Sequence, residues 1–130
     1  GPHKKSLYIE NTYDSFDEAE IREFGGICLD FSHLENDRIL RPEIYEADIK
    51  ALESHQPECS HIAAVKKTVL LDEANQKRIA SHHLTKLSEL DYLKRYPLEY
   101  FGQVAAIELE NTIEEQLKAK EYISTLIKNI

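Results

Sequence analysis

Residues 27–33 read ICLDFSH, a short apolar run that ends in Asp30 and is followed three residues later by His33. Two other apolar runs also end in acids: residues 7–10 read LYIE, and residues 103–110 read QVAAIELE. A buried carboxylate without a partner costs several kcal/mol, so acids at the ends of three strands indicate a shared opening. Carboxylates and a histidine around one opening are typical oxygen and nitrogen ligands of a metal ion.

The apolar runs alternate with segments at helical spacing, which predicts the order of the elements. We expect strands over residues 7–10, 27–31, 61–65 and 103–109, with a weaker candidate over 68–71. We expect helices over residues 16–24 and 42–55, another beginning near 85, and a last one after Asn111-Thr112, with a long polar loop over 33–41. Strands separated by helices pair in parallel through right-handed crossovers. The sequence therefore predicts a single α/β domain of four βα units with parallel strands.

Side-chain alternation within these strands separates an aliphatic face from an acidic one. In the last strand Glu108 and Glu110 share one face, whereas Ile107 lies on the other. In the second strand Cys28 and Asp30 likewise lie on one face. An aliphatic face covered by helices, with acids at the C-terminal rim of the other face, is typical of a barrel. An eight-fold barrel takes about 200 residues or more, so four units amount to half of one.

Composition and charge exclude several classes of protein. The chain has 130 residues, of which 42% are hydrophobic and 31% are charged, and its net charge of -8 argues against nucleic-acid binding. No apolar run approaches the roughly 20 residues of a membrane helix. Two cysteines and no secretion signal predict a reduced, cytoplasmic protein. Residues 1–3 resemble the remnant of a cleaved expression tag, which leaves residues 4–130 as the domain, and we expect these to be a piece of a longer protein.

The motifs together resemble the xylose-isomerase-like TIM-barrel superfamily, which includes sugar-phosphate isomerases and epimerases and the endonuclease IV type of repair enzyme. Glu10-Asn11-Thr12 looks like the Glu-Asn-Thr that ends the fifth strand of that family. Asp30-Phe31-Ser32-His33 matches the Asp-x-x-His after its sixth strand. The resemblance implies that the chain corresponds to the C-terminal half of a (β/α)8 barrel.

The resemblance also implies a ligand set for a divalent metal, which could be Mn, Mg, Zn or Fe. The implied metal ligands are Glu10, Asp30, His33, His61, His83 and Glu110. Glu108 lies on the same strand face as Glu110 and is the alternative to it. Ser81 stands where the family often has an Asp, a departure that weakens the case for a site with several metal ions. Glu10 and Glu110 are the implied acid/base residues.

Three functions follow from this ligand set. The first is a metal-dependent isomerase or epimerase that moves the proton alpha to the carbonyl of a sugar or sugar phosphate. The second is a metal-dependent phosphodiester hydrolase. The third is a non-catalytic half-barrel that binds the missing half or forms a homo-oligomer, since half a barrel leaves two sheet edges open. Without a site, the strand-end acids would simply pair with basic neighbours or cap helices.

Overall fold

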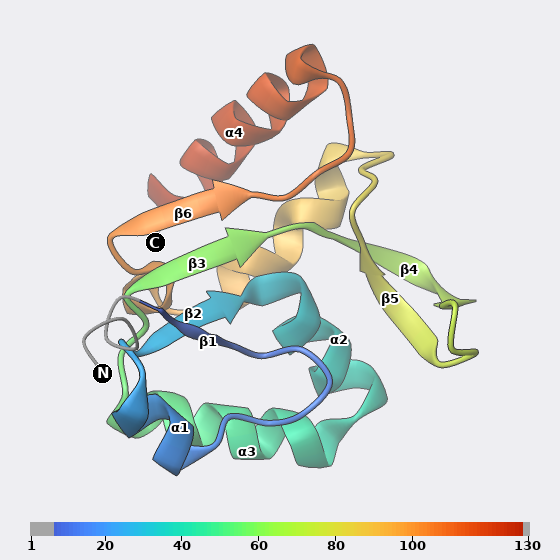
Figure 1. Cartoon of the computed structure of the whole chain (residues 1–130). Helices are drawn as coiled ribbons and strands as arrows, with labels where there is room; N and C mark the ends of the chain where they lie inside the picture. The colour runs from blue at the N-terminus through green and yellow to red at the C-terminus, as the bar shows by residue number, and fades with distance from the viewer. Residues whose placement is uncertain (1–6, 129–130) are drawn as a thin grey trace.

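A four-stranded parallel sheet forms the centre of the molecule, as seen in a computed structural model that describes residues 7–128 (Figure 1). Its strands lie side by side in chain order: β1 (Ile9–Glu10), β2 (Ile27–Asp30), β3 (Cys59–Ile62) and β6 (Val104–Ile107). The register pairs Cys28 with Cys59, Asp30 with His61, and Ile62 with Ile107. The expected α/β fold with parallel strands is confirmed, and the C-terminal ends of all four strands lie along one edge of the sheet.

The helices share a single hydrophobic core with one face of this sheet. They are α1 (Glu18–Glu23), α2 (Phe31–Leu40), α3 (Pro42–Ser54), the 3-10 helices η2 (Leu87–Arg95) and η3 (Leu98–Phe101), and α4 (Ile113–Lys128). From the sheet, Ile27, Leu29 and Ile62 enter this core and are almost fully buried. The alternate residues of β2 and β3, beginning with Cys28 and Cys59, point to the opposite face. The alternation in the sequence therefore predicted the two faces correctly.

The expected polar loop over residues 33–41 is wrong, because this segment is helix α2. Asp30 caps the helix: its Oδ1 accepts a hydrogen bond from the backbone N–H of His33 at 3.0 Å. The helix carries no apolar stripe, because Glu35, Asn36 and Asp37 are buried together with its apolar residues. Sequence periodicity identifies helices by such a stripe, so it does not predict a helix whose buried face includes polar residues.

The expected strand over residues 61–65 is two strands separated by Ala63. Its first part belongs to β3, and its second part begins β4 (Ala64–Leu71), which also absorbs the candidate over 68–71. β4 pairs antiparallel with β5 (Lys77–Ser81), forming a hairpin that the sequence did not predict. The hairpin projects beyond the C-terminal ends of the parallel strands (Figure 1). It is held there by buried Asn36 of α2, whose Oδ1 accepts the backbone N–H of Ile79 at 2.7 Å.

The helix expected from about residue 85 is the 3-10 helix η2, and the last strand and helix lie close to their expected places. Residues 1–3, interpreted as a tag remnant, lie outside the described residues. Between residues 7 and 128, no helix combines the length and the apolar character that crossing a bilayer requires.

Candidate metal centre

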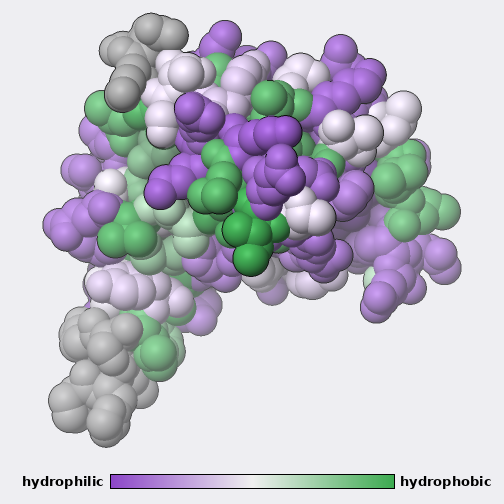
Figure 2. Space-filling view, turned by 90° about the horizontal axis from the view of Figure 1, so that it is seen from above, coloured by the Kyte–Doolittle hydropathy of each residue, from purple (hydrophilic) through white to green (hydrophobic). Residues whose placement is uncertain are grey.

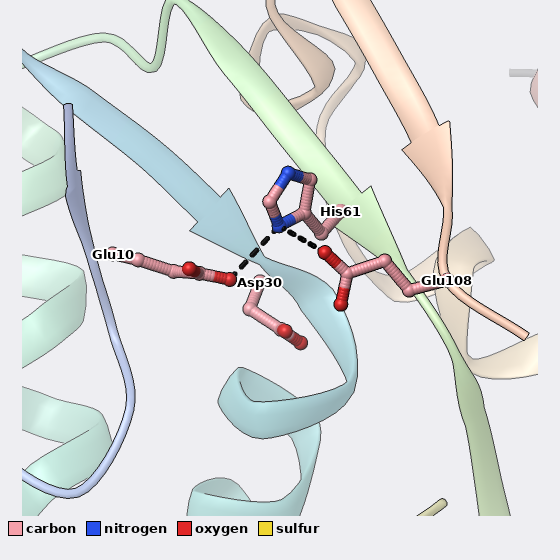
Figure 3. Close-up of side chains that lie close together, drawn as sticks. All are labelled: Glu10, Asp30, His61 and Glu108. Carbon is pink, nitrogen blue, oxygen red and sulfur yellow. Dashed lines mark hydrogen bonds and ion pairs between the residues drawn. The ribbon is translucent and has the colours of Figure 1, made fainter. Parts of the chain in front are cut away.

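Four ionisable side chains converge at the C-terminal edge of the sheet, one from each parallel strand or the residue just beyond it. They are Glu10 at the end of β1, Asp30 at the end of β2, His61 in β3, and Glu108 directly after β6. One ligand atom from each residue can be chosen so that all four atoms lie within 4.8 Å of one another. Figure 3 shows the imidazole of His61 between the two glutamates, with Asp30 beside them. The cluster follows from strand order, since neighbouring parallel strands deliver their last residues to one edge.

His61 is in contact with two carboxylates through the same ring nitrogen. Its Nδ1 lies 2.9 Å from Glu10 Oε1 and 2.7 Å from Glu108 Oε1. An imidazole nitrogen carries at most one hydrogen, which two carboxylates here would have to share. A divalent cation satisfies the same three groups at once, because each then donates a lone pair to it. The side chains of His61, Glu10 and Glu108 are 28%, 34% and 38% exposed, so the cluster is open to solvent.

Asp30 is the buried member of the cluster, with a side chain only 3% exposed. Its Oδ1 accepts hydrogen bonds from Ser32 Oγ at 2.8 Å and from the His33 backbone N–H at 3.0 Å. Its Oδ2 lies 3.9 Å from His33 Nδ1, which is an ion-pair distance rather than a hydrogen bond. Asp30 therefore caps α2 and also belongs to the cluster.

Asn11 fixes the relative position of the two neighbouring strand ends. Its Oδ1 accepts the Asp30 backbone N–H at 2.7 Å, and its Nδ2 donates to the Asp30 backbone oxygen at 3.0 Å. The side chain is buried, so both hydrogen bonds are shielded from water. Sequence reasoning did not assign Asn11 a role of its own. The available signal was its position directly after the acid that ends the strand. Asn111 likewise follows an acid, and its side chain makes two hydrogen bonds to the backbone of Leu84.

The structure brings together three of the six expected ligands and places a fourth nearby. Glu10, Asp30 and His61 belong to the cluster. His33 lies next to it, and its Nδ1 is 3.1 Å from the backbone oxygen of Asn11. His33 is therefore placed at the rim of the cluster rather than inside it.

Glu110 and His83 lie outside the cluster, and Glu108 takes the position expected for Glu110. The strand ladder runs on for one residue past β6, because the Glu108 N–H donates to the Ile62 oxygen at 2.8 Å. The chain then leaves the sheet, and the Glu110 N–H donates to the backbone oxygen of His82 at 2.7 Å. Glu108 is thus the last residue of the correct face that still lies at the sheet edge, whereas Glu110 is exposed in the following loop.

Of the two adjacent histidines, His82 is the one that faces the cluster. Its Nε2 lies 3.9 Å from Glu108 Oε2. His83 is exposed, and its backbone N–H donates to Ser81 Oγ at 3.1 Å. Successive residues of an extended segment point in opposite directions, so at most one of the two histidines can reach the cluster. The sequence could not say which of the two would face inward.

A small open cavity of about 220 Å³ adjoins the cluster on the hairpin side. It is lined by the loop after β1, the start of α2 and the hairpin, including Thr12, Tyr13, His33, Arg78, Ser81 and His82. The guanidinium of Arg78 stacks over the Tyr13 ring at 4.7 Å and pairs with Asp72 at 3.2 Å. Its Nη1 is buried and has no hydrogen-bond partner among the described residues. The cavity therefore combines hydroxyl groups and imidazoles with an Arg78–Asp72 ion pair.

No family model matches this chain, and neither a curated protein nor a solved structure matches it. The resemblance to xylose-isomerase-like barrels consequently rests on the motifs in the sequence. The candidate site stands on its own geometry.

Proposed function

We propose that this chain carries the metal site of a divalent-metal-dependent isomerase or epimerase acting on a sugar or sugar phosphate. The observation that carries the proposal is the contact of one His61 nitrogen with two carboxylate oxygens, with a third carboxylate, that of Asp30, completing the group. Three carboxylates and one imidazole suit Mn, Mg, Zn or Fe(II) better than a metal that prefers thiolates.

The bound cation would polarise adjacent carbonyl and hydroxyl oxygens of the substrate, which makes the proton alpha to the carbonyl easier to remove. We assign the transfer of that proton to Glu10 and Glu108. They come from the two outermost strands of the sheet, β1 and β6, and approach His61 from opposite sides (Figure 3). A carboxylate can remove that proton as a general base and return it to the neighbouring carbon as a general acid, which moves the carbonyl group. Glu108 takes the acid/base role that the resemblance gave to Glu110.

The adjoining cavity supports a small, hydroxyl-rich substrate. Its volume of about 220 Å³ is below the roughly 300–1,000 Å³ of sites for drug-sized ligands. His33, Arg78 and Asp72 line it, and the Arg78 guanidinium pairs with the Asp72 carboxylate. Imidazole, guanidinium and carboxylate groups suit the hydroxyls of a sugar. The net charge of -8 makes DNA a less suitable substrate than a small metabolite, and so favours this function over the phosphodiester hydrolase.

The decisive test pairs two glutamates that stand two positions apart, Glu108 at the sheet edge and Glu110 in the following loop. Isothermal titration of the full chain with Mn²⁺ should show one binding site, and Glu108→Gln should weaken it roughly 10- to 100-fold or more. Glu110→Gln is the matched control, because it removes an equal charge from an exposed position outside the cluster. Equal loss of affinity in both variants, or no binding by the unmodified chain, would refute the metal site.

Catalysis has a separate test. With Mn²⁺ present, ketose and aldose phosphates incubated in D₂O should incorporate deuterium at the carbon next to the carbonyl, as seen by proton NMR. Glu10→Gln and Glu108→Gln should each abolish this exchange, whereas Glu110→Gln should leave it unchanged. Binding of Mn²⁺ without exchange on any of these substrates would retain the metal site and reject the isomerase.

The open sheet supports a second proposal, that the chain is a half-barrel completed by a second copy of itself. The strands lie in sequential parallel order, which leaves β1 and β6 as the two edges. Val104 of β6 and Ile113 and Leu117 of α4 are exposed apolar residues, and the two elements lie at the top of Figure 1. Figure 2 looks down on that side and shows hydrophobic surface surrounded by hydrophilic side chains. Two copies joined through both edges would bury these groups and close eight strands.

Light scattering after size exclusion tests this assembly. A mass of twice 15.0 kDa supports the pairing of two copies, and Val104→Lys should then give the single-chain mass. A single-chain mass at high concentration for the unmodified protein would contradict self-assembly.

A further inference from the structure

The two cysteines of the chain lie opposite each other in adjacent strands. Cys28 of β2 and Cys59 of β3 are register partners, so their side chains point to the same face of the sheet. Along the chain they are 31 residues apart by their numbering, and only the strand register brings them together.

The thiol pair lies directly beneath the candidate metal centre. Each cysteine precedes a cluster residue by two positions, Cys28 before Asp30 and Cys59 before His61. Residues two apart in a strand share a face, so the thiols form the layer below the acids. Asp30 and His61 are themselves register partners. Any shift of β2 against β3 at the cysteines is therefore passed to two of the four cluster residues.

The spacing of the strands permits a covalent bond between the two sulfurs. Neighbouring strands lie about 4.8 Å apart, which is inside the roughly 4.4–6.8 Å between Cα atoms in disulfides. The bond also needs the Cβ atoms at about 3.8 Å, so the strands must draw together or twist locally. Both cysteines are free thiols in this structure, and Cys59 is the more exposed of the two.

We propose that Cys28 and Cys59 form a reversible disulfide that distorts the candidate metal centre and lowers its affinity for metal. The disulfide is an inference about the thiols alone, whereas its effect on metal binding rests on the function proposed above. The chain has no Met and no Trp, so the two thiols are its most readily oxidised side chains.

Hydrogen peroxide is the oxidant in this proposal. The sulfur of Cys59, the more exposed residue, attacks one peroxide oxygen, the O–O bond breaks, and the products are Cys59 sulfenic acid and one water. The sulfur of Cys28 then attacks the Cys59 sulfur, and the hydroxide that leaves takes the proton of the Cys28 thiol to form a second water. Two thiols and one peroxide thus become one disulfide and two waters. A dithiol reductant reverses the reaction by exchange.

Peptide mapping of the folded chain tests the bond directly. After treatment with peroxide and blocking of free thiols, the unmodified protein should yield one linked peptide pair containing Cys28 and Cys59, and dithiothreitol should release it. The same oxidised sample should bind Mn²⁺ roughly 10- to 100-fold more weakly than the reduced one and recover on reduction. Cys59→Ser is the control, because its Mn²⁺ affinity should not respond to peroxide.

The outcomes separate this inference from the proposed function. Conversion of Cys59 to the sulfinic acid in folded protein, or linkage between chains only, would overturn the disulfide. A mapped disulfide with unchanged Mn²⁺ affinity would overturn the redox control. A reduced chain that binds no Mn²⁺ would instead refute the metal site, and the peptide map would still decide whether the thiols pair.

Discussion

Asp48 of α3 is a fully buried carboxyl group whose replacement should change how stability depends on pH. Its Oδ1 accepts the backbone N–H of Phe16 at 2.9 Å, and this hydrogen bond anchors the segment between β1 and α1. Its Oδ2 has no hydrogen-bond partner among the described residues. Burial raises the pKa of Asp48 to about 6, opposed by the hydrogen bond from Phe16. Asp37 of α2 adds to the increase and Arg41 reduces it.

The pKa sets both the sign and the size of the effect. A carboxyl whose pKa is higher in the folded protein binds protons preferentially there, so it stabilises the fold at low pH. This contribution is lost as the pH rises from the ordinary pKa of 3.8 to the folded value of about 6. At about 1.4 kcal/mol for each pH unit, the loss amounts to about 3 kcal/mol of unfolding free energy.

Asp48→Asn removes the titration and keeps an oxygen that can accept from Phe16. Urea unfolding of both proteins should show the variant gaining about 2.4 kcal/mol relative to the unmodified chain between pH 4 and pH 7, most of the full effect. Asp14→Asn, at an exposed position, is the control and should show no such gain. Comparing variant with parent at each pH cancels the other carboxylates. A difference in unfolding free energy that stays constant across this range would refute the reasoning.

Three further predictions concern the metal centre and the backbone that supports it. Asn11→Ala leaves the buried backbone groups of Asp30 unpaired, so it should lower the unfolding free energy by about 2–4 kcal/mol in urea and weaken Mn²⁺ binding; an unchanged urea midpoint would contradict this. Gly102→Ala should cost about 3 kcal/mol or more by the same assay, because φ is +72° and the new Cβ would lie 2.5 Å from the backbone carbon of Glu58. Mn²⁺ at about 100 times its dissociation constant should add about 2.7 kcal/mol to the unfolding free energy, measured by thermal melting. His61→Ala should remove this gain, and a gain of equal size in the variant would place the metal elsewhere.

Local patterns in the sequence predicted the parallel strands and the faces of their side chains. Alternation alone separates Ile27 and Leu29 from Cys28 and Asp30, because the period of a strand is two residues. The same rule placed Glu108 and Glu110 on one face but could not choose between them. That choice depends on where β6 leaves the sheet, which is set by its hydrogen bonds to β3 and to the loop at His82.

Two elements were not predicted from the sequence because residues far along the chain help to stabilise them. Helix α2 buries Glu35, which is paired with Arg38 at 2.8 Å and accepts a hydrogen bond from Tyr96, 61 positions further along. In the β4–β5 hairpin, the backbone N–H of Ile79 donates to the side chain of Asn36 in the same helix. Neither contact leaves a periodic signal in its own segment.

The sequence by itself determined which residues could become ligands, since an acid after a short apolar run lies at the end of a strand. The tertiary structure alone decided which of them meet. Strand order and register bring Glu10, Asp30, His61 and Glu108 to one edge and set Cys28 opposite Cys59. The physical reason is that such pairings are made by backbone hydrogen bonds between strands, which carry no side-chain signature, so residues far apart in the chain become neighbours only when the sheet forms.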